Sequence, residues 1–130
     1  MMKEAISEKF ESGMVSHIDM DIITSELAWN SHPTFRGVYL KHLITGSQTN
    51  GTLSCHLVKI EPNCSIGNHI HEGKLEVHEV IQGKGHCHID NRETPYKTGS
   101  IALIPADTNH EVTAGEEGLF ILAKFSPALL

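Results

Sequence analysis

One stretch decides the fold: N-H-I-H-E-G-K-L-E-V-H-E-V-I-Q-G, residues 68–83. His69 and His71 are two positions apart, and on an extended strand such residues point to the same side. Four residues then separate His71 from Glu76, enough for the chain to turn and bring a carboxylate back to the two rings. Two imidazoles and a carboxylate at short range suit a divalent metal of the first transition series.

A second stretch, G-S-I-A-L-I-P-A-D-T-N-H at residues 99–110, supplies a fourth candidate ligand in His110. Together the two stretches resemble the paired motifs of the cupin superfamily. The first motif matches at His69, His71, Glu76 and Gly83, and the second matches at Gly99, Pro105 and His110. Because the four ligand types occur in the family's order, the resemblance is specific.

Three positions depart from the family pattern, and none of them removes a ligand. Asn63 stands where the first motif opens with glycine, Asp107 replaces a glycine of the second motif, and Ala114 replaces its final asparagine. We expect Asp107 to lie in a turn, because Asp adopts the left-handed conformation more readily than most residues do.

The resemblance implies an all-β fold, the double-stranded β-helix or jelly-roll barrel, with a metal inside. It implies that one divalent transition metal is bound by His69, His71, Glu76 and His110. Three imidazoles and a carboxylate leave two positions open on a six-coordinate metal, as catalysis or ligand capture requires. Fe, Mn, Ni, Zn and Co all suit such a site, and the residues do not choose among them.

The remaining chain is interpreted as one domain over residues 1–130, with short strands forming the barrel core over residues 38–125. Turn signals recur about every eight to twelve residues, which is typical of a sandwich or a barrel, and periodicity alone leaves these two undecided. No crossover helices separate the strands, so a parallel α/β sheet is excluded. One of the expected hairpin turns is Gly83-Lys84-Gly85.

Residues 1–13 show the only helical periodicity, and we expect a short N-terminal helix or arm there. Its apolar positions recur every four residues, and such a stripe must dock on the sheet or on a partner subunit. The stripe consists of Met2, Ile6 and Phe10.

Composition excludes several classes of protein. The formal charge is −6 and no Lys/Arg cluster is present, which argues against nucleic acid. No apolar run approaches the ~20 residues of a membrane span. An odd number of cysteines without C-x-x-C spacing, and no signal peptide, predict a cytoplasmic location. The cysteines are interpreted as small buried apolar side chains: Cys55, Cys64 and Cys87.

His78 is the candidate catalytic residue. It shares strand parity with Glu76, so its ring should face the barrel interior. There it can act as a general acid or base beside a metal-bound substrate or water. The alternative is a hydrogen-bonded core histidine without a chemical role.

Other polar residues are interpreted as lying outside the metal site. Glu79 has the opposite parity to Glu76, and Glu72 lies in the loop. His86 and His88 should face outward. His56 can line the cavity, whereas no pattern applies to His17, His32 and His42.

The first functional hypothesis is a small metal-dependent enzyme acting on an oxygen-bearing small molecule. The resemblance permits dioxygenase, isomerase, epimerase, decarboxylase and lyase chemistry, and a fold does not choose among them. The alternative is a non-catalytic, metal-dependent binding or sensor module. A purely structural metal is the third hypothesis, and a barrel of this size has core enough to fold without one. The few residues before the β-region are too short for a helix-turn-helix.

A homodimer is expected. The apolar N-terminal stripe and the free strand edges offer surface that a second copy can bury.

Overall fold

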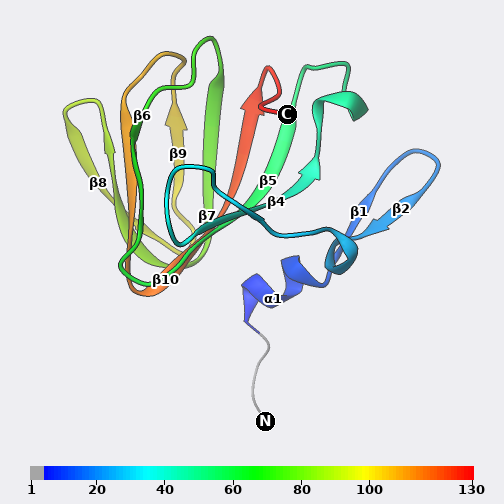
Figure 1. Ribbon diagram of the computed structural model, residues 1–130, viewed down its shortest axis with the longest axis horizontal. Helices are drawn as coiled ribbons and strands as arrows, with labels where there is room; N and C mark the ends of the chain where they lie inside the picture. The colour runs from blue at the N-terminus through cyan, green and yellow to red at the C-terminus, as the bar shows by residue number, and fades with distance from the viewer. Residues whose placement is uncertain (1–4) are drawn as a thin grey trace.

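The computed structural model describes residues 5–130 and consists mainly of antiparallel strands (Figure 1). Among these residues no helix has the length and apolar character that a membrane crossing requires. The elements in chain order are α1 (Ile6–Glu11), β1 (Met14–Ser16), β2 (Asp21–Ile23), the 3-10 turn η1 (Thr24–Glu26), β3 (Asn30–Ser31), β4 (Val38–Ile44), η2 (Gly46–Gln48), β5 (Ser54–Ile60), β6 (Ser65–His69), β7 (Leu75–Ile89), β8 (Arg92–Lys97), β9 (Ile101–Ile104) and β10 (His110–Ser126).

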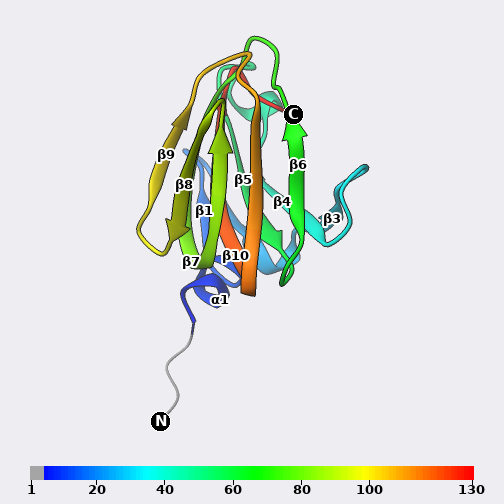
Figure 2. The same cartoon turned by 90° about the vertical axis from the view of Figure 1, so that its left-hand side faces the viewer.

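Two long strands, β7 and β10, hold the barrel together (Figures 1 and 2). The second part of β10, from Leu119, pairs with β5 on one side and with the first half of β7 on the other. The first part, His110–Ala114, pairs with β6 and with the second half of β7. Strand β9 joins the first half of β7, and β8 joins the second half. The expected all-β jelly roll with a short N-terminal helix is confirmed.

The expected hairpin turn at residues 83–85 is wrong, because these residues continue strand β7. Gly83 has a φ of 93°, and a Cβ at this position would overlap the carbonyl oxygen of Gly118. The register of β10 against β7 shifts between Ala114 and Leu119. Glycine is therefore needed where two bent strands approach closely, and the bend carries both strands from one half of the barrel to the other.

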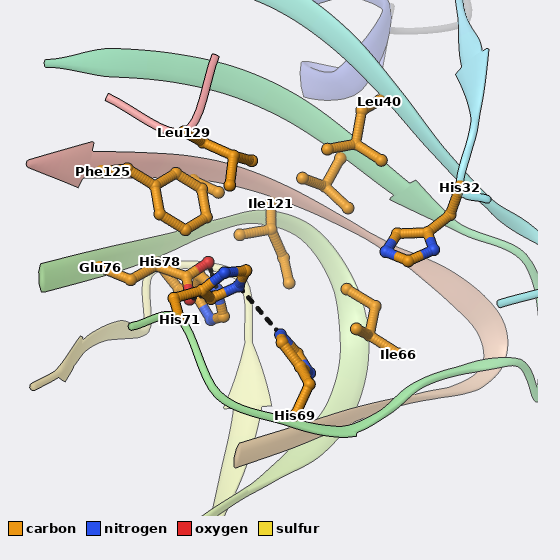
Figure 3. Close-up of a pocket in the computed structure, with 12 residues that line it drawn as sticks. His32, Leu40, Ile66, His69, His71, Glu76, His78, Ile121, Phe125 and Leu129 are labelled. Carbon is orange, nitrogen blue, oxygen red and sulfur yellow. Dashed lines mark hydrogen bonds and ion pairs between the residues drawn. The ribbon is translucent and has the colours of Figure 1, made fainter. Parts of the chain in front are cut away.

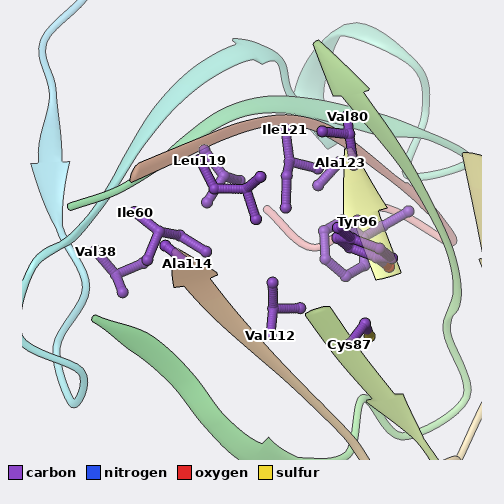
Figure 4. Packing of buried hydrophobic residues seen from close by; sticks show 12 residues of the cluster. Val38, Ile60, Val80, Cys87, Tyr96, Val112, Ala114, Leu119, Ile121 and Ala123 are labelled. Carbon is purple, nitrogen blue, oxygen red and sulfur yellow. The ribbon is translucent and has the colours of Figure 1, made fainter. Parts of the chain in front are cut away.

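The barrel interior is filled with a cluster of buried apolar side chains (Figure 4). Burying a side chain such as leucine or isoleucine contributes about 1.5–3 kcal/mol, so this cluster holds the strands that carry the site. Its members include Val38, Ile60, Val112, Leu119, Ile121, Phe125 and Tyr96. A second cluster, on the outer face of the sheet, is covered by the N-terminal segment through Val15, Leu27 and Trp29.

The N-terminal helix is shorter than expected and lies against the outer face of the sheet, one of the two places expected for it. α1 spans only part of residues 1–13, and Met2 lies outside the described residues. Ile6 and Phe10 are 46% and 36% exposed, whereas Ser7 is buried. The backbone N–H of Ser7 donates to Oε1 of Gln82 on β7 at 2.9 Å. Helix α1 therefore contacts the sheet through Ser7 and through Phe10, which lines a hollow with Leu43 and Leu122, while Ile6 stays about half exposed.

Candidate metal centre

Three histidines meet at one end of the barrel interior. His69 ends β6, His71 follows it in the loop to β7, and His110 begins β10. Their candidate ligand nitrogens all lie within 4.8 Å of one another. The antiparallel pairing of β6 with β10 places His110 directly opposite His69, so backbone register brings together residues that are far apart in the sequence.

Backbone carbonyl groups determine which nitrogen two of these rings present to the site. His69 Nδ1 lies 2.7 Å from the Gly67 oxygen, and His110 Nδ1 lies 3.0 Å from the Thr108 oxygen. A carbonyl oxygen can only accept, so each Nδ1 carries the hydrogen and donates it. In the neutral ring Nε2 is then left with a free lone pair, as a metal-binding histidine needs.

The free nitrogens point at one another and at a carboxylate. His69 Nε2 lies 3.1 Å from His71 Nε2. Glu76 Oε1 lies 3.0 Å from His110 Nε2 and 3.7 Å from His71 Nε2. Glu76 Oε1 and His110 Nε2 are both buried and lie close to each other. Within residues 5–130, however, neither atom has a well-aligned hydrogen-bond partner. Such a set of lone pairs is stable when a cation lies among them, so these donors fit a divalent metal.

Burial and nearby charge act on the pKa values of these groups in opposite directions. Burial would raise the pKa of Glu76, but His78 and His110 outweigh it and hold that pKa well below its usual range. Burial lowers the pKa of His71, Glu76 offsets part of this effect, and the resulting pKa is about 4. Burial likewise lowers the pKa of His69. For His110, burial would lower the pKa, but the nearby Glu76 carboxylate and the hydrogen bond to the Thr108 carbonyl raise it.

His78 lies inside the barrel, as its parity predicts, and holds Glu76 in place. Its Nε2 is 2.7 Å from Glu76 Oε2, and its Nδ1 is 2.8 Å from the Tyr96 hydroxyl. The ionised carboxylate can only accept, so His78 Nε2–H donates to it. When the ring carries one proton, the Tyr96 hydroxyl donates to Nδ1. Tyr96, His78 and Glu76 thus form a buried chain of hydrogen bonds that orients the carboxylate.

A cavity of about 60 Å³ opens beside the histidines (Figure 3). Roughly 10–15 Å³ on such a measure holds one water, so the cavity admits a few waters or a small organic molecule. His69, His71, Glu76 and His78 form one wall, and His32, from the segment after β3, lies at the opposite side. A site with open space next to the ligands is suited to capturing a small molecule.

The rival residues lie where strand parity places them. Glu79 faces away from the histidines and pairs with Lys124. Glu72 is exposed in the loop. His88 is about half exposed and lies 3.6 Å from Glu93. His56 is fully buried on the inner side of β5 but does not line the cavity.

Several residues of the site were not predicted from the sequence. Tyr96 and His32 carry no local motif, and only the β7–β8 register and the path of the loop bring them here. Asp107 has a second role besides its turn. Its Oδ1 accepts from Gly73 N–H at 2.9 Å, and its own N–H donates to the His71 carbonyl at 3.2 Å. The loops that carry His71 and His110 are thereby tied together.

Comparison with known proteins decides the family. The family model described as "Cupin domain" matches residues 56–123, more than half of the chain. The chain belongs to this cupin family. The matched segment contains all four residues of the motif-based ligand set, His69, His71, Glu76 and His110.

Among curated proteins, the cupin is similar to the "Oxalate-binding protein" of Thermotoga maritima. The two are 30% identical over 67 residues, which is 51% of this chain and 55% of that protein. The cupin therefore aligns with about half the length of this relative.

Among known structures, a predicted oxalate decarboxylase from Thermotoga maritima has a TM-score of 0.76 and 24% identity, covering 83% of this chain and 99% of that one. An RmlC-like cupin from Shewanella frigidimarina has a TM-score of 0.73 and 17% identity, covering 89% and 95%. The oxalate decarboxylase of Lactobacillus farciminis, in a formate complex, has a TM-score of 0.72 and 20% identity, covering 84% and 33%. At these identities the likeness establishes the fold alone.

Proposed function

We propose that this cupin is a small metal-dependent enzyme whose metal is held by His69, His71, His110 and Glu76. One observation carries the proposal: three imidazole nitrogens converge beside a buried carboxylate oxygen that has no hydrogen-bond partner within the described residues. A metal bound there supplies Lewis-acid polarisation of an oxygen-bearing ligand. The reaction classes that suit this chemistry are dioxygenase-like, isomerase and lyase reactions.

His78 is proposed as the residue that handles a proton or, in the alternative, only positions Glu76. It lines the cavity, so a substrate can reach its ring. Both ring nitrogens are already engaged, Nε2 by Glu76 and Nδ1 by Tyr96. A proton leaving or entering His78 must therefore pass at one of these two contacts, and the positioning role needs no such passage.

The second candidate function is metal-dependent binding without turnover. It is favoured by the relative from Thermotoga maritima, whose name refers to oxalate binding rather than to a reaction. Metal-dependent consumption of a candidate substrate supports the enzyme, whereas saturable binding with no product supports the binding module.

The metal site is tested by measuring metal content with inductively coupled plasma mass spectrometry. We expect about one Fe, Mn, Ni, Co or Zn ion per chain in the wild type and loss of most of it in His110→Ala, because an open four-residue site loses a ligand. The matched control is His88→Ala, since His88 is a partly exposed histidine outside the site. Full metal content in His110→Ala would reject the assignment.

Two further variants separate the roles of the neighbouring residues. Glu76→Gln should weaken metal binding, and unchanged affinity for the metal would remove Glu76 from the ligand set.

His78→Gln should keep the metal but lose turnover if His78 transfers a proton. Unchanged turnover in metal-loaded His78→Gln would leave only the positioning role.

We also propose a homodimer and a cytoplasmic location. Among residues 5–130, strand β9 pairs with β7 alone, and it exposes Ile101 and Leu103, which a second copy can cover. Light scattering gives the mass that tests the dimer.

The proposed cytoplasmic location agrees with the three cysteines, which are unpaired as in proteins of a reducing compartment. Fractionation of the source cells tests the location.

A further inference from the structure

The walls of the cavity change character away from the histidines (Figure 3). One side presents the imidazoles of His69, His71 and His78 and the Glu76 carboxylate, whereas the remaining walls are hydrocarbon apart from His32. Within residues 5–130, no lysine or arginine lines the cavity. The apolar walls come from four strands and the C-terminal segment, through Leu40, Val58, Ile66, Ile121, Phe125 and Leu129.

The polar group on the far side is the imidazole of His32. Its Nδ1 accepts hydrogen bonds from the backbone N–H groups of Thr34 and Phe35, at 3.0 and 3.2 Å. The hydrogen of the neutral ring is therefore on Nε2. Burial lowers the pKa of His32, which keeps the ring uncharged near neutral pH. The far wall thus offers at most one neutral donor and no positive charge.

We infer that the cavity selects a small monoanion that chelates through two oxygens and carries a short hydrocarbon body. The inference rests on the proposed function, because the metal centre provides the binding of the two oxygens. The body lies against the apolar walls, where each methylene removed from water adds to the affinity. A second carboxylate at the far end would be desolvated without a counter-charge, which is unfavourable.

Straight-chain 2-oxo acids test this inference, because they share one chelating head and differ in the body. Full-length protein loaded with one equivalent of Co²⁺ is titrated calorimetrically with pyruvate, 2-oxobutanoate and 2-oxopentanoate. We expect about fourfold tighter binding for each added methylene. 2-Oxoglutarate has the same length as 2-oxopentanoate but ends in a carboxylate, and it should bind no tighter than pyruvate.

Two variants locate the effect in the cavity. Leu40→Phe fills the space for the hydrocarbon body, so it should abolish the gain in affinity from pyruvate to 2-oxopentanoate. Uptake of Co²⁺ reports that the variant has folded. The matched control is Leu103→Phe on β9, whose side chain is exposed on the face opposite to Ala102 and Ile104. It should retain the wild-type gain. If Leu40→Phe does not fold, the wild-type series alone decides.

Each outcome has one meaning. Absence of Co²⁺ uptake would overturn the proposed function and the inference with it. Co²⁺ uptake with equal affinities along the series, with no binding of any 2-oxo acid, or with 2-oxoglutarate bound as tightly as 2-oxopentanoate would overturn the inference alone. A rising series that fails only for 2-oxoglutarate supports it.

Discussion

His56 is a buried histidine that belongs to a separate polar cluster. Its Nδ1 lies 2.8 Å from Nδ1 of His42 on β4, and its Nε2 lies 2.8 Å from the Ser54 hydroxyl. Between two neutral rings only one Nδ1 carries the shared hydrogen. Burial, with a smaller contribution from neighbouring His42, lowers the pKa of His56 to about 4. The folded protein therefore keeps this ring neutral in mildly acidic solution.

This cluster makes stability sensitive to acid. In the unfolded chain an ordinary histidine takes up a proton below about pH 6.5, while folded His56 stays neutral down to about pH 4. The unfolded state then binds more protons, so the free energy of unfolding falls as pH drops through this window. We expect the urea midpoint of metal-free His56→Gln to fall less between pH 7 and pH 5 than that of the wild type.

The control for this comparison is His88→Gln, which removes a partly exposed histidine. Apart from His42, which contacts His56, the other histidines keep their surroundings in His56→Gln, so the difference in pH dependence reports on the His42–His56 pair. An equal loss of midpoint in wild type and His56→Gln would contradict the assignment.

Single residues also mark how far the sequence could predict the site. Asn63 and Asp107, which replace family glycines, have φ of 61° and 62°. Asn and Asp tolerate this conformation, so the expectation for Asp107 is confirmed. The parity of His78 placed it correctly inside the barrel. His32 could not be predicted, because its approach depends on the path of a loop rather than on local periodicity.

At the level of elements, the bend in β7 depends on Gly83. Alanine there combines a positive φ with overlap of the Gly118 carbonyl. We expect Gly83→Ala to lower the free energy of unfolding by about 2–4 kcal/mol, as severe backbone and packing defects do. Urea unfolding of the two proteins measures this loss.

Gly73→Ala is the matched control for strain without overlap. Gly73 has a φ of 66°, and a Cβ there would have no neighbour within 4 Å. Gly73→Ala should lower the free energy of unfolding by only about 1–2 kcal/mol, which is the strain of an alanine in the left-handed conformation. Equal losses at both positions would show that close approach of β7 and β10 is not what requires glycine at residue 83.

The elements show why strand signals were easier to interpret than turns. Short apolar runs between turn signals predicted strands within residues 38–125, and β4 and β5 form there because their apolar side chains are buried in the two hydrophobic clusters. Glycine at residues 83 and 85 is typical of both a reversal and a bend. Whether the chain reverses or bends at these glycines depends on its pairing with β10, which the local sequence does not reveal.

The whole molecule has an unpaired apolar edge. Ile101 and Leu103 on β9 are 73% and 61% exposed, and an edge strand of this kind is open to pairing with another chain. We expect the double substitution Ile101→Lys and Leu103→Lys to convert a dimer into a monomer in multi-angle light scattering. Retained metal content would show that the variant is folded. A monomeric wild type, or a variant that stays dimeric, would contradict this interface.

The pairing of His110 with His69 also has a consequence for folding. The residues from His69 to Glu76 are synthesised well before His110, and they lack their partner until β10 docks between β6 and β7. Contacts between such distant segments form slowly because they require closure of a long loop. A metal held as proposed by His69, His71, Glu76 and His110 would therefore be bound tightly only after β10 has docked, because His110 is the last of these residues to reach the site.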